Sequence, residues 1–140
     1  MLSALLLIPL LGALVIGCWP GKLTSERARN LSIVCLGGNL IASLYLLSQF
    51  DLAIAGLQFQ ESLPWLDSLG LSYELGVDGL SLPLLLINSL LSLVSVYASD
   101  KNIPRARLYY ALLLLIAFAV AGAFVAQNLL LFFIFYELEL

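Results

Sequence analysis

The chain has 140 residues, of which 62% are hydrophobic and 11% are charged, and its mean hydropathy is +1.06. Roughly a quarter of the residues in a soluble domain are charged, so about half of the usual charge is missing and most of the surface must face lipid. The net charge of −3 offers no basic face for nucleic acid, and the lack of histidine excludes histidine relays, histidine metal sites and Ser–His–Asp triads.

Charged residues divide the sequence into uncharged stretches of transmembrane length. The stretches over residues 1–21, 30–50 and 79–99 are each close to the ~20 residues that cross ~30 Å of hydrocarbon as a helix. A fourth uncharged run, residues 108–136, corresponds to ~44 Å of helix, which is too long for one ordinary span. We divide this run at its strongly polar pair, Gln127-Asn128, because asparagine is a good helix N-cap.

This division predicts an all-α fold, a polytopic transmembrane bundle with four full spans and the start of a fifth. The expected helices of this single membrane domain cover residues 2–19, 30–50, 79–99, 108–126 and 129–140. From Asn128 to Leu140 a helix rises only ~18 Å and would end inside the hydrocarbon with unsatisfied carbonyl groups. We therefore expect the sequence to be the N-terminal part of a longer chain.

The six basic residues are confined to two loops. They are Lys22, Arg27, Arg29, Lys101, Arg105 and Arg107. The intervening connection, residues 51–78, has several acids and no base. The positive-inside rule places both basic loops on the cytoplasmic side or its equivalent, and the N-terminus on the opposite side. Apolar residues are interspersed along the connection, so we expect an ordered loop lying across the outer face of the helices.

Glu137 is the strongest candidate for a functional acid because of its position in the expected fifth helix. It lies ~13.5 Å along the helix beyond Asn128, close to the expected bilayer midplane. A carboxylate at that depth costs several kcal/mol unless it is neutral or paired, so by default it marks a proton or ion pathway. Burial disfavours the charged carboxylate and a nearby lysine favours it, so a glutamate between these influences can exchange a proton near neutral pH. The alternative is a glutamate that a neighbouring helix satisfies structurally.

Two further acids are weaker candidates. Glu139 follows Glu137 by ~200° of helical turn, so the two acids point to opposite sides and do not form a glycosidase-like or aspartic-protease-like pair. Asp78 precedes Gly79 at the start of the third expected helix, where an N-cap would satisfy the first amides and favour the helix dipole. Composition favours this structural role for Asp78 over a functional one.

Small polar residues recur at helical spacing along the third expected span. They are Asn88, Ser89, Ser92, Ser95 and Ser99. Such a stripe is typical of close helix packing, and in a minority of proteins it lines a hydrated path.

Two segments resemble a known family. Residues 73–81, YELGVDGLS, resemble the hLGVDGLS segment of the antiporter-like subunits of complex I and of Mrp-type cation/proton antiporters. Residues 132–140, FFIFYELEL, resemble the FF…(W/Y)E segment on the fifth helix of these subunits. The Glu-Leu-Glu-Leu form is closest to the photosynthetic complex I of cyanobacteria and chloroplasts.

This resemblance implies a function and roles for the acids. Glu137 matches the essential glutamate of the family, which pairs with a lysine on a later helix, while quinone reduction elsewhere in the complex drives proton movement through half-channels. Asp78 and Gly79 match motif positions of structural role, and Glu139 matches only the photosynthetic variant. The implied protein is a translocase subunit that binds no redox cofactor and no metal, and it assembles with other complex I-type membrane subunits in a thylakoid bilayer.

Two alternatives remain open at the level of sequence. An Mrp-type cation/proton antiporter subunit shares both motifs but has no electron-transfer partner. A passive membrane scaffold would use its glutamates only to join helices.

Overall fold

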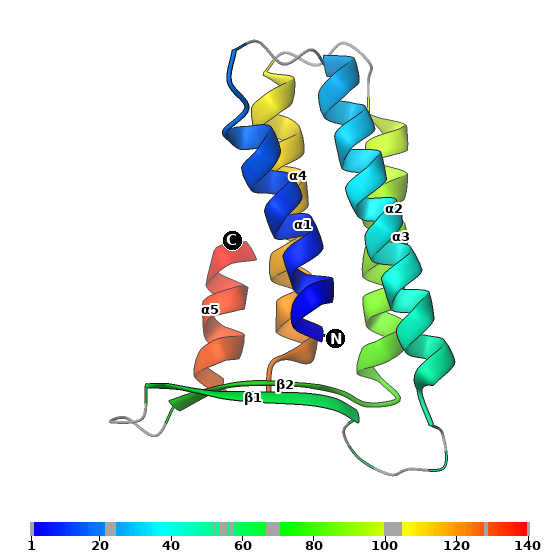
Figure 1. Cartoon of the computed structure of the whole chain (residues 1–140), viewed down its shortest axis with the longest axis vertical. Helices are drawn as coiled ribbons and strands as arrows, with labels where there is room; N and C mark the ends of the chain where they lie inside the picture. Colours follow the sequence, from blue (N-terminus) through cyan, green and yellow to red (C-terminus); the bar gives the residue numbers. More distant parts are fainter. Residues whose placement is uncertain are drawn as a thin grey trace.

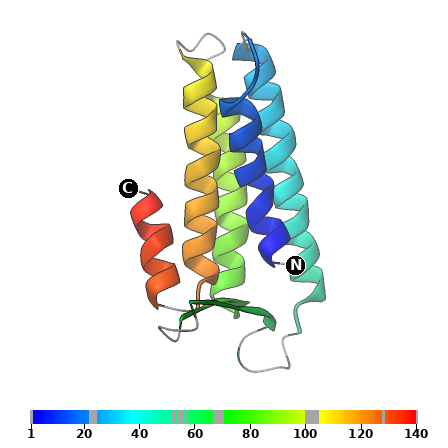
Figure 2. The same cartoon turned by 60° about the vertical axis from the view of Figure 1, so that its left-hand side comes forward.

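Five helices and one hairpin make up the described part of the chain. The computed structural model describes residues 2–21, 25–51, 53, 56, 58–66, 71–99, 105–127 and 129–139. In chain order the elements are α1 (Leu2–Gly17), α2 (Ser25–Gln49), β1 (Gln58–Leu66), β2 (Leu71–Val77), α3 (Ser81–Ala98), α4 (Ala106–Val125) and α5 (Leu129–Glu139). Helices α1 to α4 stand side by side as a bundle, and α5 rises beside α4 (Figures 1 and 2). The prediction of five helices is confirmed for these residues.

Two clusters of buried side chains hold the helices together. The cluster toward the hairpin contains Leu5, Leu6, Leu46, Leu75, Val77, Leu82, Leu85, Ala121, Val125, Leu131 and Phe135. The cluster toward the other end contains Ala13, Ile16, Ala28, Leu36, Val96, Ala106, Tyr110, Leu114 and Ala117. Large apolar side chains also cover the outside of the bundle, where Val34 is 71% exposed and Ile41 is 69% exposed. Soluble monomers rarely present such extensive apolar surface, so this outer face suits lipid.

Helix length decides which elements can cross a membrane. Within the described residues, three helices are long and apolar enough to do so, over Glu26–Gln49, Ser81–Ala98 and Ala106–Val125. Two shorter apolar helices cover Ala4–Gly17 and Leu129–Leu138. Three of the four predicted full spans therefore reach spanning length, and the span at residues 2–19 stays a prediction.

The second helix begins at Ser25, earlier than the predicted start at residue 30. The prediction began each helix at its first uncharged residue, whereas helical hydrogen bonding continues into the interface beyond the hydrocarbon. Serine and an early acid, here Glu26, both suit a helix N-terminus. Arg29 lies inside the extra turn, where its Nη2 donates to the Tyr97 carbonyl oxygen at 3.3 Å and its guanidinium lies 5.8 Å from the Tyr97 ring centroid.

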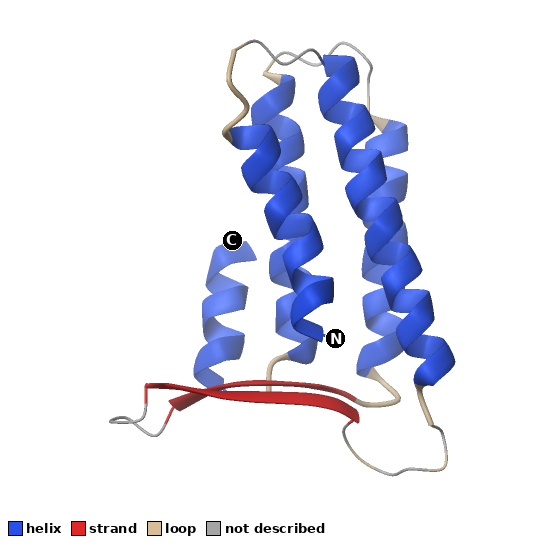
Figure 3. Cartoon of the chain, in the orientation of Figure 1, coloured by secondary structure: helices blue, strands red, loops and turns tan. Residues whose placement is uncertain are grey.

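The connection over residues 51–78 contains a β-hairpin that the sequence analysis did not predict. Strands β1 and β2 pair antiparallel, with Glu61 opposite Leu75 and Leu63 opposite Tyr73. The hairpin crosses one end of the bundle, as expected for the position of this segment (Figure 3). We expected an ordered loop without strands, whereas the structure has paired strands, because interspersed apolar and polar residues also suit a half-covered strand.

The described residues that flank the two basic loops lie at the end of the bundle opposite the hairpin. Nη2 of Arg107, in the first turn of α4, donates to the carbonyl oxygen of Gly21 after α1. The Arg29 contact with Tyr97 likewise joins the start of α2 to the end of α3. All four described arginines therefore lie at this one end of the folded bundle, where α2 and α4 begin (Figure 1).

Candidate functional site

The break between α4 and α5 is held by the hairpin. The backbone of Ala126 is extended after α4, and Ala126 forms an isolated antiparallel bridge with Leu75 of β2. The Gln127 amide N–H donates to the Glu74 carbonyl oxygen at 3.0 Å, and Gln127 Nε2 donates to the Gly76 carbonyl oxygen at 3.1 Å. These bonds satisfy backbone groups that a helix break inside a membrane protein would otherwise expose.

This junction brings together the two segments that carry the family resemblance. Residues 73–77 of the first segment form part of β2, and the second segment lies on α5, directly after the break. Leu75, Val77 and Phe135 share one buried cluster. The two segments are more than 50 residues apart in sequence, so their contact could not be predicted. Gln127, at the predicted division between two helices, bonds to the first segment directly before the helix that carries the second.

Helix α5 packs on α4 through one aromatic ring. The Phe135 ring lies over Gly122, where a methyl group would overlap its carbon atoms. The Phe118 ring meets the Phe135 ring in a T-shaped arrangement, with centroids 5.4 Å apart and planes at 71°. Leu131, one turn earlier on α5, is also buried. Small residues allow this kind of close approach between helices in lipid, so Gly122 sets the distance between α4 and α5.

Glu137 lies in the last turn of α5. The helix begins at the hairpin and ends at about mid-height of the bundle (Figures 1 and 2). Glu137 is two residues beyond buried Phe135, so it points about 200° away from the face that packs on α4, and it is exposed in this chain. Glu139 is the final residue of α5, and its side chain lies outside the described part of the structure. Asn128, the predicted N-cap, also lies outside the described residues.

No described basic side chain lies at the hairpin end of the bundle where α5 begins. The described arginines are Arg27, Arg29, Arg105 and Arg107, which belong to the first turns of α2 and α4 or precede them, at the opposite end. No group of three or more potential metal ligands occurs among the residues that the structure describes. The carboxyl groups of α5 are those of Glu137 and Glu139, and Glu137 is the one whose side chain the structure describes.

Asp78 caps α3. Its Oδ1 accepts from the backbone N–H groups of Leu80 at 2.9 Å and Ser81 at 2.8 Å, and its carbonyl oxygen accepts from the N–H of Leu82. The amides of Ser81 and Leu80 lower the pKa of this carboxyl group, because their hydrogen bonds favour its charged form. Asp78 therefore acts as the N-cap although regular helix begins at Ser81. The neighbouring Gly79 has open space where a side chain would begin, so packing does not require glycine there.

Two residues of the polar stripe on α3, Asn88 and Ser89, bond to α4 and α2, whereas Ser95 is exposed and bonds to the Leu91 carbonyl oxygen of its own helix. Ser89 Oγ accepts from Asn39 Nδ2 at 3.2 Å and lies 3.1 Å from Ser43 Oγ, and all three side chains are buried. Asn88 Nδ2 donates to the Ala117 carbonyl oxygen on α4 at 3.2 Å. Sequence reasoning missed the α2 half of this contact, although Asn39 and Ser43 stand four residues apart on one helical face. The packing interpretation of the stripe fits these bonds.

The fold and surface define an integral membrane protein of the multi-helix class. No family profile matches the chain. It is 38% identical over 99% of its length to NAD(P)H-quinone oxidoreductase chain 4 2 of Microcystis aeruginosa, 36% identical to chain 4-2 of Synechocystis sp. and 37% identical to chain 4 of Synechococcus sp.. The chain is homologous to the N-terminal quarter of this complex I-like membrane subunit, of which it spans 25% or 26% of the length.

A solved structure has the same fold. A chain in the structure of the membrane-bound sulfane sulfur reductase, an archaeal respiratory membrane complex, superposes with a TM-score of 0.63 over 96% of this chain and 21% of its own length. The two sequences are 21% identical. The arrangement of helices and hairpin is thus shared with a subunit of a respiratory membrane complex.

Proposed function

We propose that this chain forms the first part of a proton-translocating membrane subunit of a complex I-type quinone oxidoreductase. The observation that carries the proposal is the place of Glu137: an acid in the last turn of a short helix that rises to mid-height of the bundle. The relatives named above are chains of NAD(P)H-quinone oxidoreductases, which favours this function over an Mrp-type antiporter.

Glu137 acts by holding and releasing a proton. A lysine from a later helix of the full-length chain approaches its exposed face and favours the carboxylate, while exclusion of water favours the neutral acid. Quinone reduction elsewhere in the assembly shifts the balance between these states, so the proton moves in step with the redox reaction. Electron transfer takes place in other subunits, and this chain contributes no cofactor ligand.

The junction described above gives the carboxyl group a fixed position. Helix α5 turns by 100° per residue, so a slip of one residue would move Glu137 away from its partner. The bonds of Gln127 to β2 and the contact of Phe135 with Gly122 oppose both rotation and translation of α5. The hairpin and α4 are therefore positioning elements for the acid.

The proposal includes orientation, location and partners. The basic end of the bundle faces the cytoplasmic side or its equivalent, and the hairpin and N-terminus face the opposite side. The membrane is a thylakoid membrane, and the partners are the other membrane subunits of the complex. The four-span topology of residues 1–126, continuing into a longer chain, belongs to the same proposal.

Replacement of Glu137 by glutamine in the full complex tests the mechanism. Glutamine keeps the size of the side chain but carries no titratable proton, so quinone-linked proton uptake should fall at least tenfold while the complex still assembles. Glu139→Gln is the matched control, because it removes an acid from the same helix turn on the opposite side. Undiminished proton uptake by the Glu137→Gln complex would refute the mechanism.

Two other outcomes would identify the alternatives. Sodium-dependent proton exchange by membranes without quinone reductase activity would indicate an antiporter. Intact assembly and transport in a Glu137→Ala complex would indicate a scaffold.

A further inference from the structure

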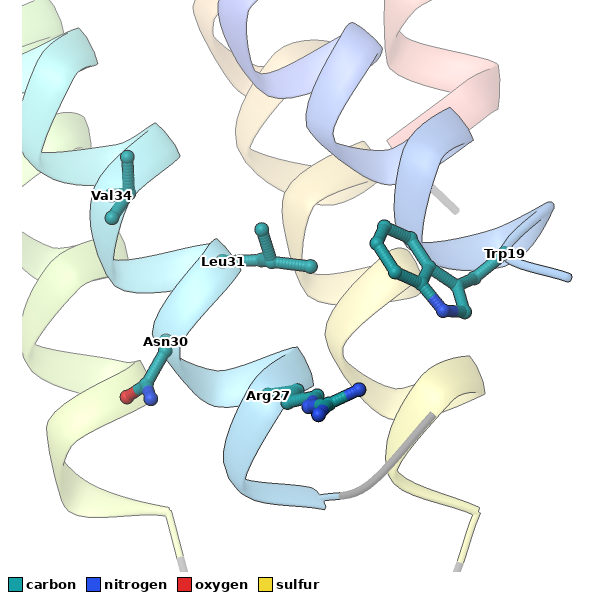
Figure 4. Close-up of a pocket in the computed structure, with 5 residues that line it drawn as sticks. All are labelled: Trp19, Arg27, Asn30, Leu31 and Val34. Atoms are coloured by element: carbon teal, nitrogen blue, oxygen red, sulfur yellow. The ribbon is translucent and has the colours of Figure 1, made fainter. Parts of the chain in front are cut away.

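A hollow opens on the flank of the bundle at its basic end. It has a volume of about 350 Å³ and is lined by Trp19, Arg27, Asn30, Leu31 and Val34. Figure 4 shows that Arg27 and Leu31 extend from α2 toward Trp19, which follows the end of α1. None of these residues belongs to α5, so the hollow lies outside the proposed proton pathway.

The lining changes from polar to apolar along α2. Arg27, Asn30, Leu31 and Val34 recur at the i, i+3, i+4, i+7 spacing of one helical face. Their Cα atoms span about 10 Å along the helix axis, with the polar pair nearer the end of the bundle and the apolar pair nearer its middle. This order matches the order of groups in a lipid, whose charged headgroup lies outside its acyl chains.

Charge at this end favours an anion. The sequence between α1 and the second turn of α2, and that between α3 and the first turn of α4, together contain all six basic residues of the chain and two acids, Glu26 and Asp100. Arginine presents a planar set of donors that matches phosphate and similar oxyanions, and tryptophan is enriched where headgroups meet hydrocarbon. A small soluble anion would leave the apolar half of the hollow unused, because Val34 is 71% exposed.

We propose that this hollow binds one anionic glycerolipid of the surrounding bilayer. The headgroup oxygens accept hydrogen bonds from the Arg27 guanidinium and the Asn30 amide, the Trp19 ring covers the glycerol region, and one acyl chain lies along Leu31 and Val34. The lipid fills the space between the end of α1 and the first turns of α2, and so holds these two helices together. This assignment is independent of the role of Glu137.

Native mass spectrometry of the full-length protein, extracted from vesicles of phosphatidylcholine and phosphatidylglycerol at 4:1, tests the site. The wild-type protein should retain one phosphatidylglycerol per copy in preference to phosphatidylcholine. Loss of one arginine charge at a membrane surface weakens anionic lipid binding about fivefold, so Arg27→Gln should lower the retained fraction by at least that factor. Arg105→Gln, which removes a charge from the same end outside the hollow, should leave it unchanged.

A second pair of variants tests the apolar half without changing charge. Val34→Trp fills the hollow and should displace the lipid, whereas Ile41→Trp places the same ring seven residues further along the same helical face and should not. Equal retention of phosphatidylglycerol by the wild type, Arg27→Gln and Val34→Trp would overturn the proposal.

Photo-crosslinking in the wild-type background identifies the occupant directly. A benzophenone amino acid at position 34 of the assembled complex should capture phosphatidylglycerol. Capture of a protein segment, from a later part of the chain or from another subunit, would show that protein covers the hollow and would overturn the assignment. Equal capture of phosphatidylcholine would overturn the claim of charge selectivity.

Discussion

The contact between Gly122 and Phe135 makes a strong prediction for the substitution Gly122→Ala. Three ring carbons of Phe135 lie within 3.0 Å of the position that a methyl carbon would take, so the ring or the whole helix α5 must move. Phe135 is 6% exposed and packs on Phe118, so moving it breaks the contacts that dock α5. Overpacking of this kind costs roughly 1–3 kcal/mol.

The higher helix propensity of alanine partly offsets this loss of stability, and a second glycine in a helix provides a control for it. Replacing glycine by alanine inside a helix stabilises it by ~1 kcal/mol, so the net destabilisation by Gly122→Ala should be roughly 0–2 kcal/mol. Gly37, inside α2, has open space where a side chain would begin. Gly37→Ala should therefore stabilise the protein by up to ~1 kcal/mol, in the opposite direction.

A double-mutant cycle isolates the contact. In a Phe135→Ala background the ring is gone, so Gly122→Ala should change from destabilising to neutral or stabilising, with a coupling of roughly 1–3 kcal/mol. Reversible unfolding of the full-length protein in mixed micelles measures each free energy. If Gly122→Ala stabilised the wild-type protein as much as Gly37→Ala does, the docking of α5 described above would be incorrect.

The remaining predictions concern the cap of α3 and the helix break. Asp78→Ala should cost α3 roughly 0.5–2 kcal/mol, and Asp78→Asn should cost less because it keeps an acceptor, as measured by hydrogen exchange of the Leu80 and Ser81 amides. Since the folded-state pKa of Asp78 is lowered, the stability that this carboxylate contributes is fully present above its ordinary pKa of ~3.9 and disappears as pH falls through the lower folded-state pKa. If protection of the Leu80 and Ser81 amides against hydrogen exchange increased on acidification, this sign would be wrong. Gln127→Ala should lower the free energy of unfolding by ~1 kcal/mol and speed amide hydrogen exchange in β2, because it removes the bond to the Gly76 carbonyl oxygen. The control Gln49→Ala, at an exposed position, should have neither effect. Equal exchange in both variants would show that the Gln127 side chain does not stabilise the junction.

Composition and charge spacing predicted the helices well because lipid imposes a simple rule. An apolar stretch of spanning length in a membrane must satisfy its backbone internally, which leaves the helix as the available form. The division near Gln127 followed from the same rule, since ~44 Å of uncharged helix exceeds one span. The start of α2 was predicted too late because the rule concerns the hydrocarbon and says nothing about helical turns in the interface.

The site was only partly predictable. Glu137 stood out because an acid is costly at the depth that the sequence predicts for it, and Asp78 because its position suited an N-cap. The roles of Gly122 and Gln127 could not be read from their neighbours in sequence. A glycine in a helix signals close packing without naming its partner, and Phe135 and Gly76 are the partners only because the chain folds back on itself.

The sequence by itself determined the class of protein, the number of helices in the described residues and the separation of basic from acidic connections along the chain. The reason is that the free energy of transfer into lipid is approximately a sum over residues and depends little on tertiary contacts. The tertiary structure decided the pairing of β1 with β2, the hydrogen bonding of β2 to the break between α4 and α5, and the packing of α5 on α4. These features depend on hydrogen bonds and ring contacts between residues far apart in the chain, such as Gln127 with Gly76 at 3.1 Å. Local pattern cannot specify such contacts, since each donor or ring has many acceptable partners until the fold brings one within reach.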